Sequence, residues 1–444
     1  MSDTRGAVPG GGILLIARRT IVRGIGICVA AFLTGAACIA GAQSPMDSIA
    51  KLPGNWAERD SSSMLSTARL DSLPAANRAV WRAYIERSRR LKSSDQAFMA
   101  RELAQLGRDT MSRAPYVREF SIRDDMTPDW FATDSARRIA DQILTWQTPS
   151  GGWSKHVDVM LRARQPGESF FSENTNWQYI ATVDNGSTTS QLEFLARADR
   201  ATSSGEPRYR SAFVRGVRYL LNAQYPNGCW PQVYPLQGGY HDAATYNDDS
   251  MLHVLEMLGD VALRRQPFVP DSDVMASRAA VAKGLGCILA SQVVVGGHRR
   301  VWGQQNDPLT LQPVQARSYE HASLTAQESA HLLDYLMRLP SSGPRIVSAV
   351  HDGVAWLKAT PVYGLTWDFG TGLHETPGAG PLWARMYEIG TNRPIFSDRD
   401  GIVRYKWWEL NDRRIGYAWY TDAPVATLKR YEVWSRTHPR PAAH

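Results

Sequence analysis

Two short acidic motifs stand before stretches with helical periodicity, and their residues could hold a metal ion. Val183-Asp184-Asn185-Gly186 precedes one stretch, and Tyr246-Asn247-Asp248-Asp249 precedes the next. Carboxylates and carbonyls are the ligands of Ca²⁺, which takes about six to eight oxygens in irregular geometry. Each acidic site alone is better explained as a helix N-cap than as a metal ligand. Their recurrence before successive helices favours a shared hard cation.

A second group of candidates is cationic and would bind carboxylates. Its members are Lys155, Arg317, Arg385, Arg399 and Arg413. Guanidinium groups bind carboxylates through paired hydrogen bonds, so the residue types alone make Arg317 a carboxylate clamp. The flanking Asp398 and Asp400 favour a structural ion pair for Arg399, and Lys155 alone is typical of a surface lysine.

Helices of two alternating classes are expected to position these residues. Apolar periodicity in the first class is seen over 139–146, 214–221, 281–289 and 347–357. Each of these stretches leads to a turn with an aromatic residue, at intervals of about 70 residues: Trp153, Trp230, Trp302 and Trp367. Stretches of the second class start near Gly186, Asp248 and Ser323. The alternation predicts an all-α, (α/α)3 toroid-like domain with irregular loops and few short strands.

The N-terminus has the parts of a secretion signal. Arg18, Arg19 and Arg23 precede an apolar stretch, and Ala40-Gly41-Ala42 offers a small-x-small cleavage site. We therefore expect a signal peptide over 1–42, and a secreted or periplasmic protein that is not held in a membrane after cleavage. An uncleaved anchor and a lipoprotein signal at Cys38 are the alternatives.

Two regions follow the expected signal peptide. Residues 43–128 begin with a polar stretch and continue with a helix-like pattern over 81–107, without a motif that carries chemistry. We expect a helical accessory extension there, and one main domain over 129–440.

Composition narrows the range of partners. The net charge is +7 without a run rich in Lys and Arg, which argues against nucleic acid and suits a polyanion. Only Cys229 and Cys287 remain after the signal peptide; they could pair, and no Cys/His cluster supports zinc. Fifteen Trp and seventeen Tyr can stack on sugars, but they also fill hydrophobic cores.

A series of ordered motifs between about 139 and 420 resembles the all-α pectate lyases, family 10 of the polysaccharide lyases. The motifs are Gly151-Gly152-Trp153-Ser154-Lys155, Asp184-Asn185-Gly186, Gln224-Tyr225-Pro226-Asn227-Gly228, Trp230-Pro231-Gln232, Asn247-Asp248-Asp249, Ala316-Arg317-Ser318-Tyr319-Glu320 and Phe396-Ser397-Asp398-Arg399-Asp400-Gly401. Two departures from the family pattern, Cys229 and Asn306, concern only the details of substrate subsites.

The resemblance implies a helical toroid with a cleft, and a monomer that cleaves α-1,4-linked polygalacturonate by Ca²⁺-assisted β-elimination. It implies that Arg317 is the catalytic base and that Asp184 and Asp248 bind the Ca²⁺ ion. The residues expected to contact the acidic polysaccharide are Lys155, Asn185, Arg385, Arg399 and Arg413. An arginine base must be neutral, so we expect local Ca²⁺, burial and neighbouring Arg or Lys to lower the pKa of Arg317.

Two other functions are compatible with the same residues. A glycoside hydrolase on a helical toroid would use Asp184 and Asp248 as acid and base, about 6.5–9.5 Å apart in an inverting enzyme. A sugar-binding protein without catalysis would use Trp153, Trp230 and Trp302 as stacking platforms.

Overall fold

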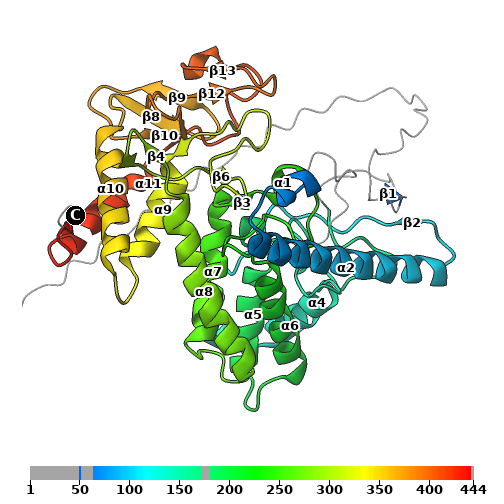
Figure 1. Ribbon diagram of the computed structural model, residues 1–444. Coiled ribbons are helices and arrows are strands. Elements are labelled where there is room, and N and C mark those ends of the chain that lie inside the picture. Colours follow the sequence, from blue (N-terminus) through cyan, green and yellow to red (C-terminus); the bar gives the residue numbers. More distant parts are fainter. Residues whose placement is uncertain (1–49, 52–63, 173–180, 442–444) are drawn as a thin grey trace, which may run out of the picture. The chain divides into compact units, whose positions relative to one another are not determined.

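The computed structural model of the chain describes residues 50–51, 64–172 and 181–441. The expected signal peptide over 1–42 lies outside the described residues. Figure 1 shows the order of the elements, which are mostly helical.

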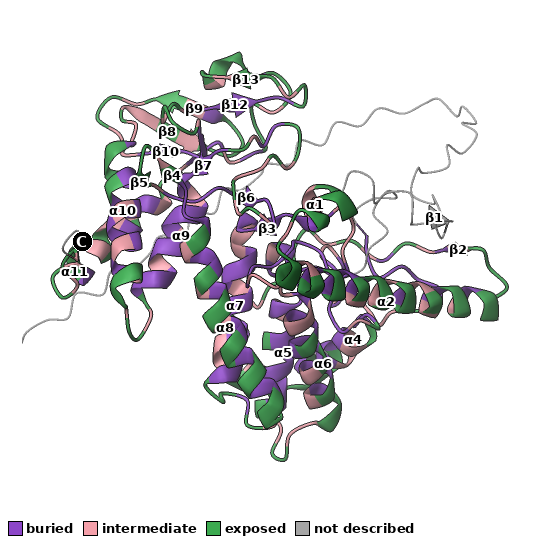
Figure 2. Ribbon diagram, in the orientation of Figure 1, coloured by how far each residue is buried: buried purple, intermediate pink, exposed green. Residues whose placement is uncertain are grey.

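Eight helices of the main domain alternate between two layers (Figure 1). The helices of the outer layer pack on one another in order: α4 (Asp134–Thr145), α6 (Pro207–Ala223), α8 (Asp271–Ser291) and α10 (Pro344–Ala359). The inner layer consists of α5 (Thr189–Arg200), α7 (Ser250–Ala262), α9 (Ala326–Met337) and α11 (Ala423–Trp434). Figure 2 shows that α7 is buried along most of its length, as an inner helix should be. The three predicted helix pairs are therefore present, and α10 with α11 forms a further pair.

A buried tryptophan repeats after each outer helix and ties the following turn to it. The indole N–H donates to a carbonyl in the outer helix at 2.7–2.8 Å in all four cases: Trp153 to Ile143, Trp230 to Leu220, Trp302 to Ile288 and Trp383 to Leu357. The prediction that Trp367 is the fourth tryptophan of this series is wrong. Trp367 lies half-buried in a hairpin inserted between α10 and Trp383.

A glutamine latch joins successive outer helices. Gln147, directly after the C-cap of α4, donates through Nε2 to the carbonyls of Gly151 and Ala212 at 2.7 and 2.9 Å. Gln224 makes the corresponding pair of bonds from α6 to α8, and Gln292 makes it from α8 to α10. Each latch satisfies polar groups at a helix end that would otherwise lack partners.

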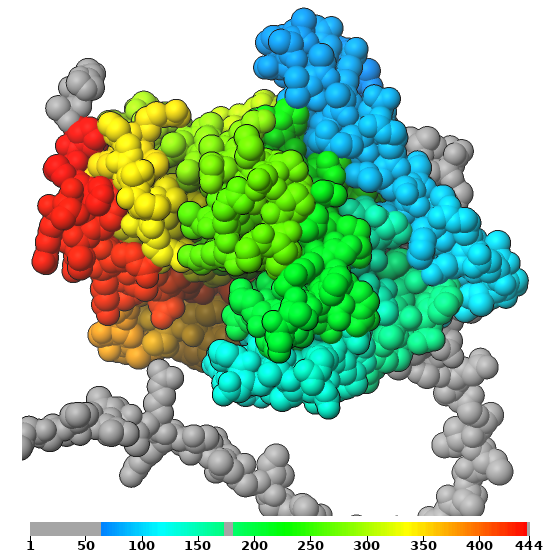
Figure 3. All heavy atoms as spheres, turned by 90° about the horizontal axis from the view of Figure 1, so that it is seen from below, coloured from blue at the N-terminus to red at the C-terminus, as the bar shows by residue number. Residues whose placement is uncertain are grey.

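The N-terminal region packs on the main domain through a long helix. Helices α1 (Thr67–Asp71), α2 (Ala75–Gln105) and α3 (Pro128–Phe131) precede α4. The Tyr84 hydroxyl of α2 donates to the Ala223 carbonyl at 3.0 Å, and Asp95 accepts from the Ser150 backbone N–H at 2.8 Å. Figure 3 shows this segment in blue beside the green helices of the main domain. The same view shows α11 in red beside the yellow α9 and α10.

The strands of the described residues are short and form two-stranded antiparallel pairs. The pairs are β1 (Ala50–Lys51) with β2 (Thr110–Met111), β3 (Ala244–Thr245) with β6 (Gln305–Asn306), β4 (Val294–Val295) with β5 (His298–Arg299), β7 (Leu324–Thr325) with β11 (Met386–Tyr387), β8 (Leu365–Asp368) with β9 (Gly372–Glu375), β10 (Trp383–Ala384) with β14 (Tyr420–Thr421), and β12 (Phe396–Ser397) with β13 (Val403–Arg404). Several of them lie in the turns that lead into inner helices and so help to fix the start of those helices.

A disulfide joins Cys229 and Cys287, whose pairing the sequence left open. The two Cα atoms are 5.4 Å apart, and both side chains are buried between the turn after α6 and helix α8. Helix α8 is long and apolar enough to span a bilayer by those two criteria alone. Its packing on α7 and its disulfide account for this apolar character in the core of the domain.

Candidate active site

Two 3₁₀ turns with matching backbones lead into α5 and α7. In η2 (Asp184–Gly186) Asn185 is left-handed, with φ 51° and ψ 36°, and in η4 (Asn247–Asp249) Asp248 is left-handed, with φ 50° and ψ 35°. The residue that follows in each turn, Gly186 or Asp249, also has a positive φ. Asp184 therefore corresponds to Asn247, and Asn185 corresponds to Asp248. The acidic residues recur in successive turns as predicted, but they are offset by one position. Left-handed backbone costs a non-glycine residue about 1 kcal/mol or more, and such residues concentrate at functional sites.

Asp184 is a buried carboxylate with one unsatisfied oxygen. Its Oδ2 lies 2.6 Å from the Lys155 ammonium, so Lys155 is part of the site rather than a surface residue. Its Oδ1 is buried and has no hydrogen-bond partner of ordinary geometry among the described residues. Burial raises the pKa of Asp184, but the charge and the hydrogen bond of Lys155 outweigh this effect and hold the pKa below its usual value.

Asp248 lies close enough to Asp184 for the two charges to affect each other. Burial, followed by the negative charge of Asp184, raises the pKa of Asp248 to about 6. The Asn247 amide donates to Asp248 Oδ2 at 2.7 Å, and the Arg385 guanidinium lies 3.8 Å from Oδ1. A divalent cation between the two carboxylates would relieve their repulsion.

Arg385 is enclosed by polar groups of the second and third helix pairs. It is 5% exposed, and its Nη2 donates to Glu328 Oε1 at 2.7 Å and to Asn247 Oδ1 at 3.1 Å. Glu328 comes from the first turn of α9. Arg385 thus fixes the relative positions of η4 and α9 beside Asp248.

Arg317 is held by Glu320 in a two-point ion pair. Its Nε donates to Glu320 Oε2 at 2.7 Å, and Nη2 donates to Oε1. The same carboxylate accepts from the Tyr417 hydroxyl at 2.9 Å and from the Gln304 amide at 3.2 Å. Burial lowers the pKa of Arg317, but the hydrogen bonds and the charge of Glu320 raise it by more, so the net pKa is above its usual value. This direction is opposite to the lowering expected from Ca²⁺, burial and neighbouring cations, which stays a prediction for the Ca²⁺-bound protein.

Three arginines converge on the ring of Tyr417. The guanidinium carbons of Arg385, Arg413 and Arg317 lie 5.0, 5.3 and 5.8 Å from the ring centroid. Arg413 also lies 4.5 Å from the ring centroid of Tyr319, and its buried Nε has no hydrogen-bond partner among the described residues. Tyr417 was not among the site residues predicted from the sequence. The cluster carries concentrated positive charge, which suits a substrate with carboxylates.

Arg399 does not join this cluster. Its guanidinium is exposed and binds Asp412 at 2.8 Å. The ion pair expected for Arg399 therefore exists, but neither Asp398 nor Asp400 is the partner. Asp400 binds Arg404 at 2.7 Å, while Asp398 accepts from the backbone N–H of Arg413 at 2.9 Å.

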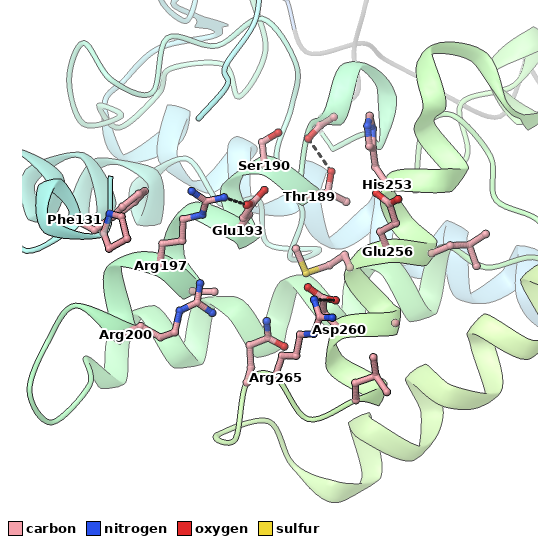
Figure 4. A pocket seen from close by; sticks show the side chains of 18 of the residues that line it. Phe131, Thr189, Ser190, Glu193, Arg197, Arg200, His253, Glu256, Asp260 and Arg265 are labelled. Atoms are coloured by element: carbon pink, nitrogen blue, oxygen red, sulfur yellow. Dashed lines mark hydrogen bonds and ion pairs between the residues drawn. The ribbon is translucent and has the colours of Figure 1, made fainter. Parts of the chain in front are cut away.

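A pocket of about 970 Å³ lies along the inner helices α5 and α7. Figure 4 shows Glu193, Arg197, His253 and Asp260 among its lining side chains. Of the two turns described above, only Gly186 lines this pocket. Ion pairs within the lining, such as Asp260 with Arg265 at 2.9 Å, neutralise much of its charge.

The residues present fit a Ca²⁺ site that is completed by the substrate. The described ranges contain no cluster of three or more His, Cys, Asp or Glu side chains that could hold a metal. Asp184 Oδ1, which is buried and has no hydrogen bond of ordinary geometry to the described residues, and the partly exposed Asp248 nevertheless offer two carboxylates on adjacent turns. Calcium also accepts carbonyls, waters and ligand oxygens, so two protein carboxylates can bind the ion together with such further oxygens.

Comparisons with known proteins agree with this arrangement. Residues 147–428 match the model of the pectic acid lyase family. The chain belongs to this family. Within it, a family 10 polysaccharide lyase from Cellvibrio cellulosa is 34% identical, with a TM-score of 0.60, over 71% of this chain and 98% of that one. An aspartate-to-alanine variant of a family 10 polysaccharide lyase from the same organism, solved in complex with trigalacturonic acid, is 33% identical. Its TM-score is 0.60, over 72% of this chain and all of that one.

Membership in the pectic acid lyase family confirms a polysaccharide lyase with an α/α toroid fold. The structure also removes the basis for a sugar-binding protein built on tryptophans. Trp153, Trp230 and Trp302 are each at most 1% exposed, so none of them can stack on a sugar.

Proposed function

We propose that this lyase cleaves α-1,4-linked polygalacturonate by Ca²⁺-assisted β-elimination and releases unsaturated oligogalacturonides. The observation that carries the proposal is the convergence of two carboxylates and three arginines from separate helix pairs. Asp184 and Asp248 lie within electrostatic reach of each other and of Arg317. The complex of a similar lyase with trigalacturonic acid supports the choice of an acidic polysaccharide.

The chemistry requires that charge be stabilised on the substrate carboxylate. Removing the C5 proton of a galacturonate unit pushes electrons toward the adjacent carboxylate, so positive charge there stabilises the transition state. Arg385 donates to Asn247 of η4, and Arg413 lies over the same Tyr417 ring as Arg385, so both supply fixed positive charge at the site. When bound by Asp184 and Asp248, Ca²⁺ would supply Lewis-acid stabilisation of the same carboxylate.

We assign the proton-accepting role to Arg317. The C5 proton passes to a neutral guanidine nitrogen, the C5–H electrons form the C4=C5 double bond, and the C4–O4 bond breaks. The departing oxygen takes a proton from solvent, so no water is added to the product. Arg317 must leave Glu320 and lose a proton before it can act, because the pair stabilises the cation. Glu320 keeps Tyr417 and Gln304 as partners when Arg317 turns away.

Lys155, Asn185, Arg385, Arg399 and Arg413 remain the proposed contacts of the substrate. Lys155, from the loop after α4, binds Asp184, and Asn185 follows Asp184 in η2. Arg385, Arg399 and Arg413 come from the C-terminal loops. We further propose that the enzyme is a monomer that is secreted or exported to the periplasm through the N-terminal signal.

One assay tests the proposal. The mature protein is incubated with polygalacturonate in the presence of Ca²⁺ or of a chelator, and ultraviolet absorbance of the unsaturated product is followed. We expect absorbance to rise with Ca²⁺ and to stop with the chelator. New reducing ends without absorbance would indicate a hydrolase, and binding without any turnover would indicate a sugar-binding protein.

A further inference from the structure

A segment of the N-terminal region, residues 113–120, lies beside the loop that carries Lys155. The Val117 backbone N–H donates to the His156 carbonyl at 3.1 Å, and the Asp158 N–H donates to the Pro115 carbonyl at 2.9 Å. Tyr116 and Val157 form an antiparallel bridge. This segment precedes the part of the chain that matches the family model, 147–428, yet it is paired to the residue next to Lys155.

His156 holds this segment in place. Its backbone is left-handed, with φ 60°, and its Nδ1 lies 2.6 Å from the Arg118 carbonyl oxygen. The rings of Tyr116 and His156 are 5.6 Å apart between centroids. A strained backbone that is fixed by side-chain contacts is typical of residues that position a functional surface.

Tyr116 and Arg118 present their side chains to solvent. Tyr116 is 57% exposed and Arg118 is exposed. Arg118 stands at a bend of this segment, two residues after the bridge at Tyr116. Arg118 forms no ion pair with an acidic side chain in the described ranges, and its charge is available to a ligand.

The guanidinium of Arg118 reaches a residue from the C-terminal part of the site. Its carbon lies 6.0 Å from the ring centroid of Phe369, in the turn between β8 and β9. The Phe369 carbonyl accepts from the Gly416 N–H at 3.3 Å, and Gly416 precedes Tyr417 of the arginine cluster. Arg118 therefore lies between the loop of Lys155 and the loop of Tyr417.

We propose that Tyr116, Arg118 and Phe369 form an additional subsite for the polysaccharide, which binds galacturonate units beyond those at Arg317. Exposed aromatic faces stack on sugar rings, and a guanidinium without an acidic partner binds a uronate carboxylate. The proposal rests on polygalacturonate as the substrate. It gives the N-terminal region a role in binding long chains.

The test compares a long and a short substrate in the full chain. Values of kcat/KM are measured on polygalacturonate and on trigalacturonate for the wild type, Arg118→Ala, Arg118→Lys and Tyr116→Ala. Arg101→Ala, which removes an exposed positive charge from α2, is the matched control. We expect Arg118→Ala to lower kcat/KM on the polymer about tenfold, mainly through KM, and at least about fivefold more than on the trimer. Arg118→Lys should lie in between, and added salt should narrow the difference between wild type and Arg118→Ala.

Several outcomes would overturn the subsite. Equal losses on polymer and trimer, no loss, or faster cleavage of the polymer by both alanine variants would each show that these residues do not bind distant units. If the wild type does not cleave polygalacturonate, the proposed function fails instead. The subsite is then tested by binding alone, from the retardation of wild type and Arg118→Ala in a gel that contains polygalacturonate. Weaker retardation of Arg118→Ala supports the subsite, and equal retardation refutes it.

Discussion

Asn185 and Asp248 occupy the same position in two successive turns, with backbone angles that agree within 1°. Because asparagine is accommodated in one turn, Asp248→Asn should keep the fold while it removes a carboxylate from the proposed Ca²⁺ site. We expect the Ca²⁺ concentration for half-maximal activity to rise at least about tenfold. A calcium titration of activity, with circular dichroism to check the fold, measures this effect. The control is Asp260→Asn, because Asp260 lies on the helix that follows this turn, α7, and is ion-paired to Arg265.

The Glu320 carboxylate should control the pH dependence of the lyase through Arg317. Its hydrogen bonds and charge raise the pKa of Arg317, so Glu320→Gln should lower that pKa and leave more neutral Arg317 at a given pH. We expect the rising limb of kcat against pH to move toward lower pH, although kcat at the optimum falls because Arg317 is less well placed. An unchanged limb, or a shift toward higher pH, would argue that Arg317 is not the base.

Arg413 and Arg399 should differ in their effects on catalysis. Arg413 lies over Tyr319 and Tyr417, whereas Arg399 is exposed and paired with Asp412. We expect Arg413→Ala to lower kcat/KM on polygalacturonate by about a hundredfold and Arg399→Ala by less than about fivefold. Comparable losses of kcat/KM in the two variants would mean that Arg399 leaves Asp412 and binds the substrate during the reaction.

Asp95 should make the stability of the fold depend on pH. Burial raises its pKa to about 7 although Ser150 donates hydrogen bonds to it, so the folded state retains a proton that the unfolded chain releases near pH 4. This contribution is fully present below the unfolded pKa and is lost as the pH rises through 7. Asp95→Asn should therefore be more stable than wild type at pH 8, by up to about 4 kcal/mol, with little difference at pH 4. Urea unfolding at both pH values measures this, with the exposed Asp109→Asn as control.

The Cys229–Cys287 disulfide should stabilise the protein without being accessible to a reductant in the native state. Both residues are at most 1% exposed, and 58 positions separate them. Replacing both by alanine should lower the free energy of unfolding by about 3–4 kcal/mol. Reductant should leave the activity of the folded wild type unchanged. In a thermal melt with reductant the bond is reduced as the chain unfolds, so the Tm of the wild type should fall to that of the double variant. Rapid inactivation at room temperature would show that the bond opens in the native state.

Local apolar periodicity was enough to predict the helical layers. The inner helices that follow Asp184 and Asp248 begin at Thr189 and Ser250, close to their expected starts. The fourth tryptophan was misassigned because a hairpin, β8–β9, separates α10 from Trp383, whereas Trp153 follows Gln147 closely. Sequence spacing cannot reveal an insertion that folds back on itself.

The charged residues of the site could be predicted from the sequence, but the residues that hold them in place could not. Asp184, Asp248, Arg317, Arg385 and Arg413 lie together, although their individual roles stay predictions. The roles of Tyr417 and Glu328 depend on contacts between residues far apart in the chain. Tyr417 reaches Glu320 across 97 positions, and Glu328 reaches Arg385 across 57. One sequence offers no local signal for such distant pairs. Arg317 and Glu320 are only three positions apart, and their contact raises the pKa of Arg317, opposite to the direction expected.

The series of glutamine latches between outer helices ends at a defined place in the chain. Gln147, Gln224 and Gln292 each use one amide to join their own turn to the next outer helix. After α10 the corresponding C-cap position holds Thr360, whose hydroxyl donates to Trp356 within its own helix. The connection between outer helices is therefore repeated by one type of side chain, and the repetition ends at α10, where a hydroxyl that bonds within its own helix takes the place of the amide.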